Sequence, residues 1–75
     1  MEHFVNRFII ETKRGPHYYI NLDQVKRIVV DHKDGKSTAI TFHFSKDDQV
    51  RFDRDGLERP LEELVRKLIE IEIHP

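Results

Sequence analysis

Five histidines are the side chains of this chain best suited to chemistry, because imidazole binds metals and exchanges protons near neutral pH. They are His3, His17, His32, His43 and His74. No two have the H-x-x-x-H spacing that places both rings on one helix face, and the chain has no cysteine to complete a zinc site. We therefore expect no metal and no cofactor, and we place the histidines on the surface.

A second candidate is the acidic segment Asp53-x-Asp55-Gly56, which with Glu62 imitates part of a calcium-binding loop. In that alignment Arg51 occupies the first ligand position, where a cation cannot serve. Pro60 would also stiffen the loop. We interpret the segment as the end of a strand followed by the start of a helix.

Catalytic motifs are missing from the sequence. There is no G-x-S-x-G, no glycine-rich phosphate loop and no cysteine nucleophile. Seventy-five residues form one small α+β domain (1–75), with little room for an enclosed pocket of the usual size. We predict that the protein is not an enzyme.

The charge balance and the hydropathy pattern restrict the function further. Thirteen basic and fourteen acidic residues give a net charge of -1, whereas domains that bind a phosphate backbone usually have a basic excess. No apolar run approaches the ~18 residues needed to span a bilayer, so we expect no membrane insertion. The first residues, M-E-H-F-V-N-R-F, lack the pattern of a signal peptide. A cytoplasmic protein is expected.

The stretch from Ser37 to Phe52 organises the predicted fold. It forms two strands joined by a polar turn, and strand side chains alternate between two faces. One face is apolar and carries Ile40, Phe42, Phe44, Val50 and Phe52. We expect the other elements to cover or extend this face.

Three strands are predicted before it, at residues 4–13, 18–21 and 26–32. Turns at 14–16 and at Asp34-Gly35 join neighbouring strands, and a single helical turn near residues 21–25 directs Leu22 and Val25 inward. A helix follows Pro60, with Leu61, Leu64, Val65 and Leu68 on one stripe. We expect it to end near Glu70, before an extended tail.

The architecture is therefore α+β: an antiparallel meander of about five short strands, closed by one C-terminal helix. In such a meander the second sheet face is too apolar for a fully solvated surface and too mixed for a core. We predict a protein interface there, with a second copy of the chain as one candidate partner in a homodimer; the alternative is isolated exposed aliphatic side chains, which are normal on any protein. The candidate residues are Val5, Ile9, Val29, Ala39, Thr41 and His43, together with Ile71 and Ile73 of the tail.

Nucleic-acid binding is the alternative. Strand aromatics stack on bases in some sheet-type binders, and basic residues could form an edge beside them. Against this, the phenylalanines share the face that the helix must cover. The basic residues are Lys13, Arg14, Lys26, Arg27, Lys33 and Lys36.

Three segments together resemble the flagellar FlbD-like proteins of bacteria: Y-Y-I-N-L-D-Q-V-K-R-I, T-A-I-T-F-H-F-S-K-D-D-Q-V-R-F and L-E-E-L-V-R-K-L. The shared order is hairpin, turn, hairpin and short closing helix, over most of the chain. The Asn21-Leu22-Asp23 order, the longer hairpin and the tail depart from it. The resemblance implies a small bacterial adaptor with no catalytic residues.

Overall fold

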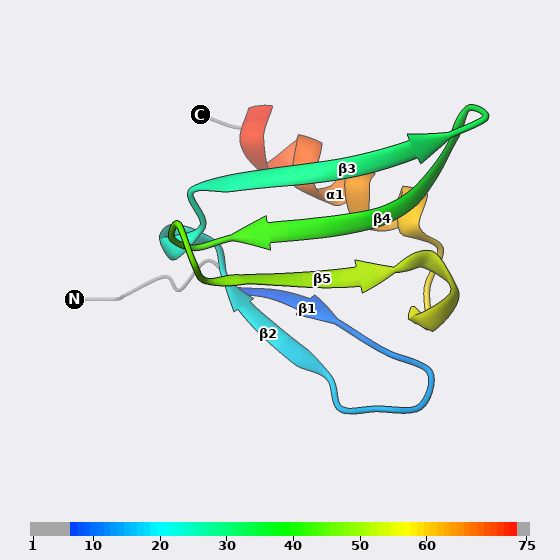
Figure 1. Cartoon of the computed structure of the whole chain (residues 1–75), viewed down its shortest axis with the longest axis horizontal. Helices are drawn as coiled ribbons and strands as arrows, with labels where there is room; N and C mark the ends of the chain where they lie inside the picture. Colours follow the sequence, from blue (N-terminus) through cyan, green and yellow to red (C-terminus); the bar gives the residue numbers. More distant parts are fainter. Residues whose placement is uncertain (1–6, 74–75) are drawn as a thin grey trace.

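The computed structural model describes residues 7–73, and the side chains of residues 7–70. The described part contains five strands, two single-turn 3-10 helices and one α-helix (Figure 1). They are β1 (Arg7–Ile10), β2 (Tyr18–Asn21), η1 (Leu22–Gln24), β3 (Arg27–Lys33), β4 (Lys36–His43), β5 (Gln49–Asp53), η2 (Arg54–Gly56) and α1 (Leu61–Ile73). All strand pairs are antiparallel, which confirms the predicted α+β class.

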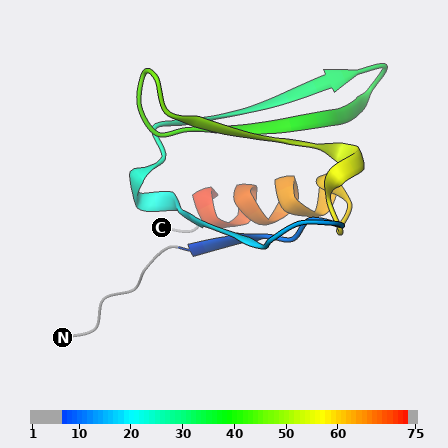
Figure 2. The same ribbon diagram turned by 60° about the horizontal axis from the view of Figure 1, so that its bottom comes forward.

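The strands form two sheets rather than the single meander expected from the sequence. β1 pairs with β2, and β3, β4 and β5 form a three-stranded sheet in that order. At the end of β2 the side chain of Asn21 accepts a hydrogen bond from the Asp23 amide (3.0 Å), which favours a turn over a continued strand. η1 and η2 join the two layers at opposite ends of the molecule (Figure 2).

The β1–β2 hairpin is held in place by a segment distant in sequence. Beyond β1 the amide of Lys13 donates to the carbonyl of Gly56 (3.0 Å), and the amide of Glu58 donates to that of Glu11 (2.9 Å). Residues 11–13 therefore pair with residues 56–58. This pairing brings the loop of the hairpin beside the end of β5.

The core lies between the three-stranded sheet on one side and the hairpin with α1 on the other. Phe42 is fully buried at its centre, with its ring centroid 6.3 Å from that of Phe8 and 6.2 Å from that of Phe52. The predicted apolar face of β4 and β5 is therefore confirmed. The buried apolar set is Phe8, Ile10, Ile20, Ala39, Ile40, Phe42, Phe52, Leu57, Leu61 and Leu64.

The turn between β3 and β4 is the one predicted at Asp34-Gly35. Both residues have positive φ, 54° and 80°, as a two-residue hairpin turn with a right-handed twist requires. A β-bulge follows, because the register shifts between Asp31 and His32. Thr38 is the extra residue, and its hydroxyl donates to the Asp31 carbonyl (3.3 Å).

Helix α1 is longer than predicted, and the expected extended tail after Glu70 is wrong. The helix continues to Ile73. Its inner stripe is as expected, since Leu61 and Leu64 are buried and Val65 and Leu68 are packed against the core.

Arg54 connects three elements of the fold. Its guanidinium donates to the Ser37 carbonyl of β4 (2.7 Å) and to both carboxylate oxygens of Glu62 on α1 (2.6 and 3.0 Å). The hydrogen bond from Arg54 is the main reason that the pKa of Glu62 lies below its ordinary value. The pKa of Glu11 is lowered in the same way, chiefly by its hydrogen bond from Arg59.

A pH dependence of stability follows from these lowered pKa values. A carboxyl group whose pKa is lower in the folded state contributes stability above its unfolded pKa, and this stability is lost as the pH falls through the folded pKa. We expect the urea concentration at the unfolding midpoint to decrease as the pH is lowered below about 4.5. Glu62→Gln should make the midpoint less dependent on pH across this range.

Glu58→Gln is the matched control, because Glu58 forms no ion pair within the described residues. It should leave the acid slope of the urea midpoint unchanged. Equal slopes for the two variants would contradict a role for the Arg54–Glu62 pair. The measurement is urea unfolding followed by circular dichroism at several pH values.

Candidate functional site

The interface residues predicted from the sequence do not form one surface. Val29, Ala39, Thr41 and His43 share the outer face of the three-stranded sheet, as the strand register shows. Ile9 belongs to the other sheet, where it pairs with Tyr19. Val5 lies outside the described residues, and so do the side chains of Ile71 and Ile73.

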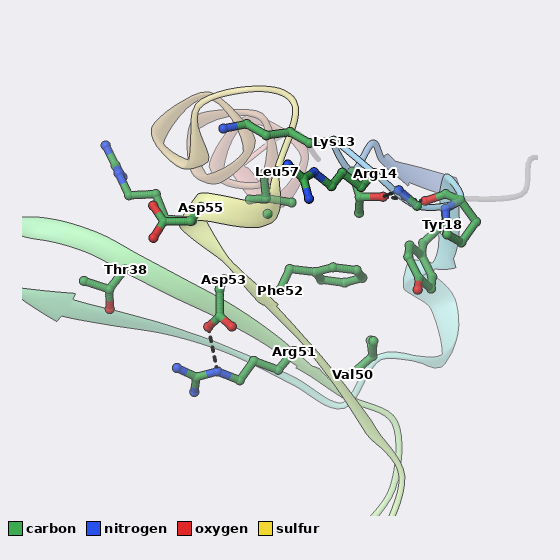
Figure 3. Close-up of a pocket in the computed structure, with 15 residues that line it drawn as sticks. Lys13, Arg14, Tyr18, Thr38, Val50, Arg51, Phe52, Asp53, Asp55 and Leu57 are labelled. Atoms are coloured by element: carbon green, nitrogen blue, oxygen red, sulfur yellow. Dashed lines mark hydrogen bonds and ion pairs between the residues drawn. The ribbon is translucent and has the colours of Figure 1, made fainter.

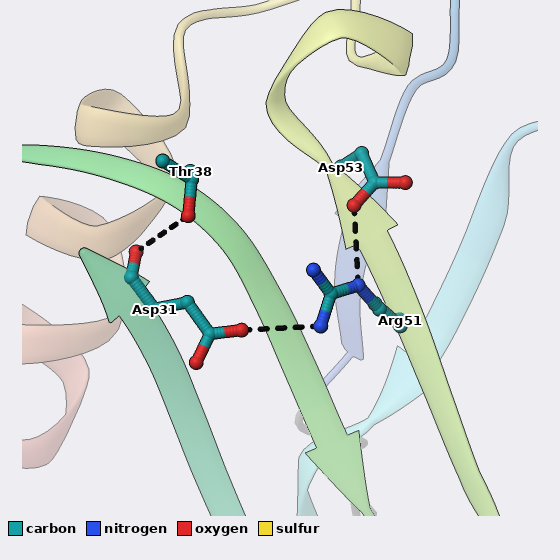
Figure 4. A network of polar contacts seen from close by, with 4 residues as sticks. All are labelled: Asp31, Thr38, Arg51 and Asp53. Carbon is teal, nitrogen blue, oxygen red and sulfur yellow. Dashed lines mark hydrogen bonds and ion pairs between the residues drawn. The ribbon is translucent and has the colours of Figure 1, made fainter. Parts of the chain in front are cut away.

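The outer face of the three-stranded sheet is also more polar than predicted. Arg51 on β5 reaches across β4 to Asp31 on β3 (Nη1–Oδ2 3.1 Å) and also contacts Asp53 (Nε–Oδ1 3.1 Å), as Figure 4 shows. The two β4 residues under this crossing, Ala39 and Thr41, have exposed fractions of only 0% and 5%. They cannot provide exposed apolar surface, so that part of the prediction is wrong.

The six basic residues proposed as one edge are divided between two places. Lys26, Arg27 and Lys33 lie along or beside β3, at one edge of the three-stranded sheet, and Lys36 is the first residue of the neighbouring strand β4. Lys13 and Arg14 lie in the loop of the β1–β2 hairpin, beside β5 at the opposite edge. A continuous basic edge is therefore not formed, because β4 and β5 separate the two groups.

A groove of about 990 Å³ lies between β5 and the loop of the β1–β2 hairpin (Figure 3). We call it the β5 groove. β5 contributes residues 50–53, the hairpin contributes residues 12–16 and Tyr18, and residues 54–57 close one end. Thr38 of the β-bulge completes the lining.

The floor of the β5 groove is apolar and closely packed. The ring of Tyr18 packs edge-on against that of Phe52, with centroids 5.1 Å apart and planes at 68°. Phe52 and Leu57 are buried, while Val50 is packed against the core. An aromatic pair held in this way offers a fixed apolar contact surface to a ligand.

The hairpin wall of the groove is held by side-chain hydrogen bonds. The hydroxyl of Thr12 donates to the carbonyl of Pro16 (2.9 Å) and accepts from the amide of Gly15 (3.1 Å). A Cβ atom at Gly15 would lie 3.0 Å from that hydroxyl, so glycine permits the close approach. These two hydrogen bonds connect the beginning of the loop with its end, which favours one conformation of the wall.

The rim of the groove carries four cationic side chains, and two of them are already engaged. Arg51 is paired with Asp31 and Asp53, and Arg54 with Glu62. Lys13 and Arg14 are exposed and form no ion pair within the described residues. These two cations are the charges that a ligand could use.

The groove also follows a free strand edge. β5 is the last strand of its sheet and pairs only with β4 in the part of the chain that the structure describes. Consecutive residues from Val50 to Asp53 line the groove although their side chains alternate between the two sheet faces. The hollow therefore runs along the edge itself, where backbone N–H and C=O groups have no strand partner.

A smaller groove of about 540 Å³ lies between β1 and α1. Its charged residues are largely paired with one another, since Arg59 contacts Glu11 (2.8 Å) and Glu63 (3.2 Å), and Lys67 lies near Glu63 (3.8 Å). We therefore treat the β5 groove as the candidate site.

Sequence reasoning did not find this groove. Phe52 was correctly assigned to the core, and Lys13 and Arg14 were named only as part of a basic edge. What was missed is the pairing of residues 11–13 with 56–58, which brings these residues together. No local periodicity carries that signal, because it joins segments far apart in the chain.

The fold and the groove together define a small α+β domain with a strand-edge groove. Within the described residues no group of three or more histidine or acidic side chains is placed to hold a metal ion. The helix that the structure describes is too short to cross a membrane. Comparison with protein-family models, with curated proteins and with solved structures gives no match.

Proposed function

We propose that the protein is a non-enzymatic binding module that takes an extended, acidic segment of a partner protein along the free edge of β5. The observation that carries the proposal is the combination in one groove of an open strand edge, an apolar floor and two unpaired cations. A segment that adds a strand to a sheet edge gains backbone hydrogen bonds, and pockets for alternate side chains give specificity.

Each part of the groove has a counterpart in such a segment. Apolar side chains of the segment would rest against Tyr18 and Phe52, and acidic ones would meet Lys13 and Arg14. The open edge of β5 favours a peptide over a nucleic acid, because only a peptide can add a strand to it. The resemblance to FlbD-like proteins supports the role of a cytoplasmic bacterial adaptor.

The test is a selection of ligands from a displayed random-peptide library, followed by fluorescence anisotropy of an enriched peptide. We expect enrichment of peptides that alternate acidic and β-branched or aromatic residues. Lys13→Glu/Arg14→Glu should weaken binding about tenfold, because two rim attractions become repulsions. N-methylation of alternate backbone amides of the peptide should weaken binding as well, because it removes the strand-pairing donors.

Lys26→Glu/Lys33→Glu is the matched control, since it changes the net charge equally along β3, at the opposite edge of the sheet. It should leave the affinity unchanged. Equal losses in the two double variants, or no enriched peptide, would contradict the proposal. Binding of a single-stranded oligonucleotide with a steep dependence on salt would instead support nucleic-acid recognition.

A further inference from the structure

The edge strand β3 is a second free edge, on the side of the sheet opposite to the β5 groove. Within the described residues β3 pairs only with β4. Its middle is apolar, with the Ile28 side chain 37% exposed and Val29 and Val30 half-buried. Exposed apolar edge strands are templates for pairing with another strand, and native proteins either block them or use them.

We propose that two copies of this chain pair through their β3 strands, antiparallel about a two-fold axis at Val29. The two three-stranded sheets would then form one continuous six-stranded sheet. A two-fold contact requires that the strand be complementary to itself. The sequence of β3, R-I-V-V-D-H-K, meets this condition in one register.

In the register centred on Val29, each pair of directly opposed residues is favourable. Arg27 of one copy lies opposite Asp31 of the other, on the outer face and twice per dimer. Ile28 lies opposite Val30, also twice, on the inner face. Val29 meets its own counterpart on the axis, so opposite charges and apolar side chains are matched from Arg27 to Asp31.

The neighbouring register, centred on Val30, is unfavourable. It places Arg27 opposite Lys33, which are like charges, and Ile28 opposite His32. Directly opposed like charges destabilise an antiparallel pair. Charge therefore selects the register centred on Val29.

The charged groups needed for this contact are accessible. Arg27 is exposed and makes no ion pair in the described part of the chain. The Oδ2 atom of Asp31 accepts a hydrogen bond from Arg51 (3.1 Å), and the second carboxylate oxygen, Oδ1, can accept one from Arg27 of the other copy. The contact leaves β5 at both outer edges of the six-stranded sheet, so dimer formation and groove binding can be tested separately.

Sedimentation velocity over a range of micromolar concentrations tests the dimer and its register. The wild-type chain should dimerise, and high salt should weaken the dimer. Arg27→Glu should weaken it about tenfold or more, because it places like charges opposite each other twice. Lys33→Glu makes the same change in charge but falls outside the matched pairs, and it should change the dimer constant by less than about twofold.

Three outcomes would overturn the proposal. The first is a wild-type chain that stays monomeric at high micromolar concentration. The second is stronger association of both variants, which is the behaviour expected of the register centred on Val30. The third is an equal loss of association in both variants, which would show a non-specific charge effect.

A cross-linking experiment gives a geometric readout, since the chain has no cysteine. Directly opposed residues in an antiparallel pair have Cα atoms about 4.5–5.5 Å apart, within the range of a disulfide. Val29→Cys should therefore form an interchain disulfide readily under mild oxidation, while Lys33→Cys, far from its counterpart, should do so much more slowly. Circular dichroism checks that both variants fold. Equal rates would place the contact elsewhere.

Discussion

Replacement of Phe42 by alanine is expected to lower the free energy of unfolding by about 3–5 kcal/mol. Phe42 is fully buried, and its ring lies between those of Phe8 and Phe52, so the cavity would open where the two layers meet. This loss approaches the whole free energy of unfolding of a small domain. We therefore expect the variant to be partly or wholly unfolded at room temperature, as urea titration followed by circular dichroism would show.

Thr41→Ala is the matched control on the adjacent position of β4. Its side chain faces the other side of the sheet, where it is buried beneath the Arg51–Asp31 contact rather than inside the core. The change removes much less volume, and we expect a loss of roughly 1 kcal/mol. Comparable urea midpoints for the two variants would mean that the inward register of β4 is wrong by one residue.

Leu61→Ala is expected to have the second-largest effect, a loss of about 2–4 kcal/mol. Leu61 is the first residue of α1 and is fully buried against the sheet. Its truncation would leave a cavity at the point where the helix begins. The same urea titration measures this loss.

Ile69→Ala provides the comparison within the same helix. The side chain of Ile69 is 49% exposed, so its truncation removes fewer buried contacts and should cost less than about 1 kcal/mol. A larger loss at Ile69 than at Leu61 would mean that the helix packs through a different face. The pair of variants thus tests the orientation of α1 independently of its length.

Local patterns predicted the elements well. The alternation of apolar residues identified β4 and β5 and the face that each presents to the core. Asn21 and Asp23 indicated the single helical turn of η1, and Asp34-Gly35 indicated the turn of the second hairpin. These features depend on neighbours in the chain, so the sequence carries them directly.

What the sequence could not show is which elements lie beside one another. The break between β2 and β3 separates Ile9 from Val29 and divides the predicted interface between two sheets. The reach of Arg51 across β4 buries Ala39 and Thr41, although period-two reasoning had placed them correctly on the outer face. Such contacts depend on the three-dimensional arrangement of strands, which alternation alone does not specify.

The pairing of the hairpin with the segment before α1 has a consequence for the order of folding. The Glu11–Arg59 contact joins residues 48 positions apart, whereas β3, β4 and β5 are joined by short turns. Closing a long loop has a larger entropic cost than closing a short one, so non-local pairings tend to form late. The β5 groove would then be assembled last, after the three-stranded sheet exists. A segment bound in it would bridge the two late-joining parts and so slow their separation, giving the bound protein a longer lifetime against unfolding.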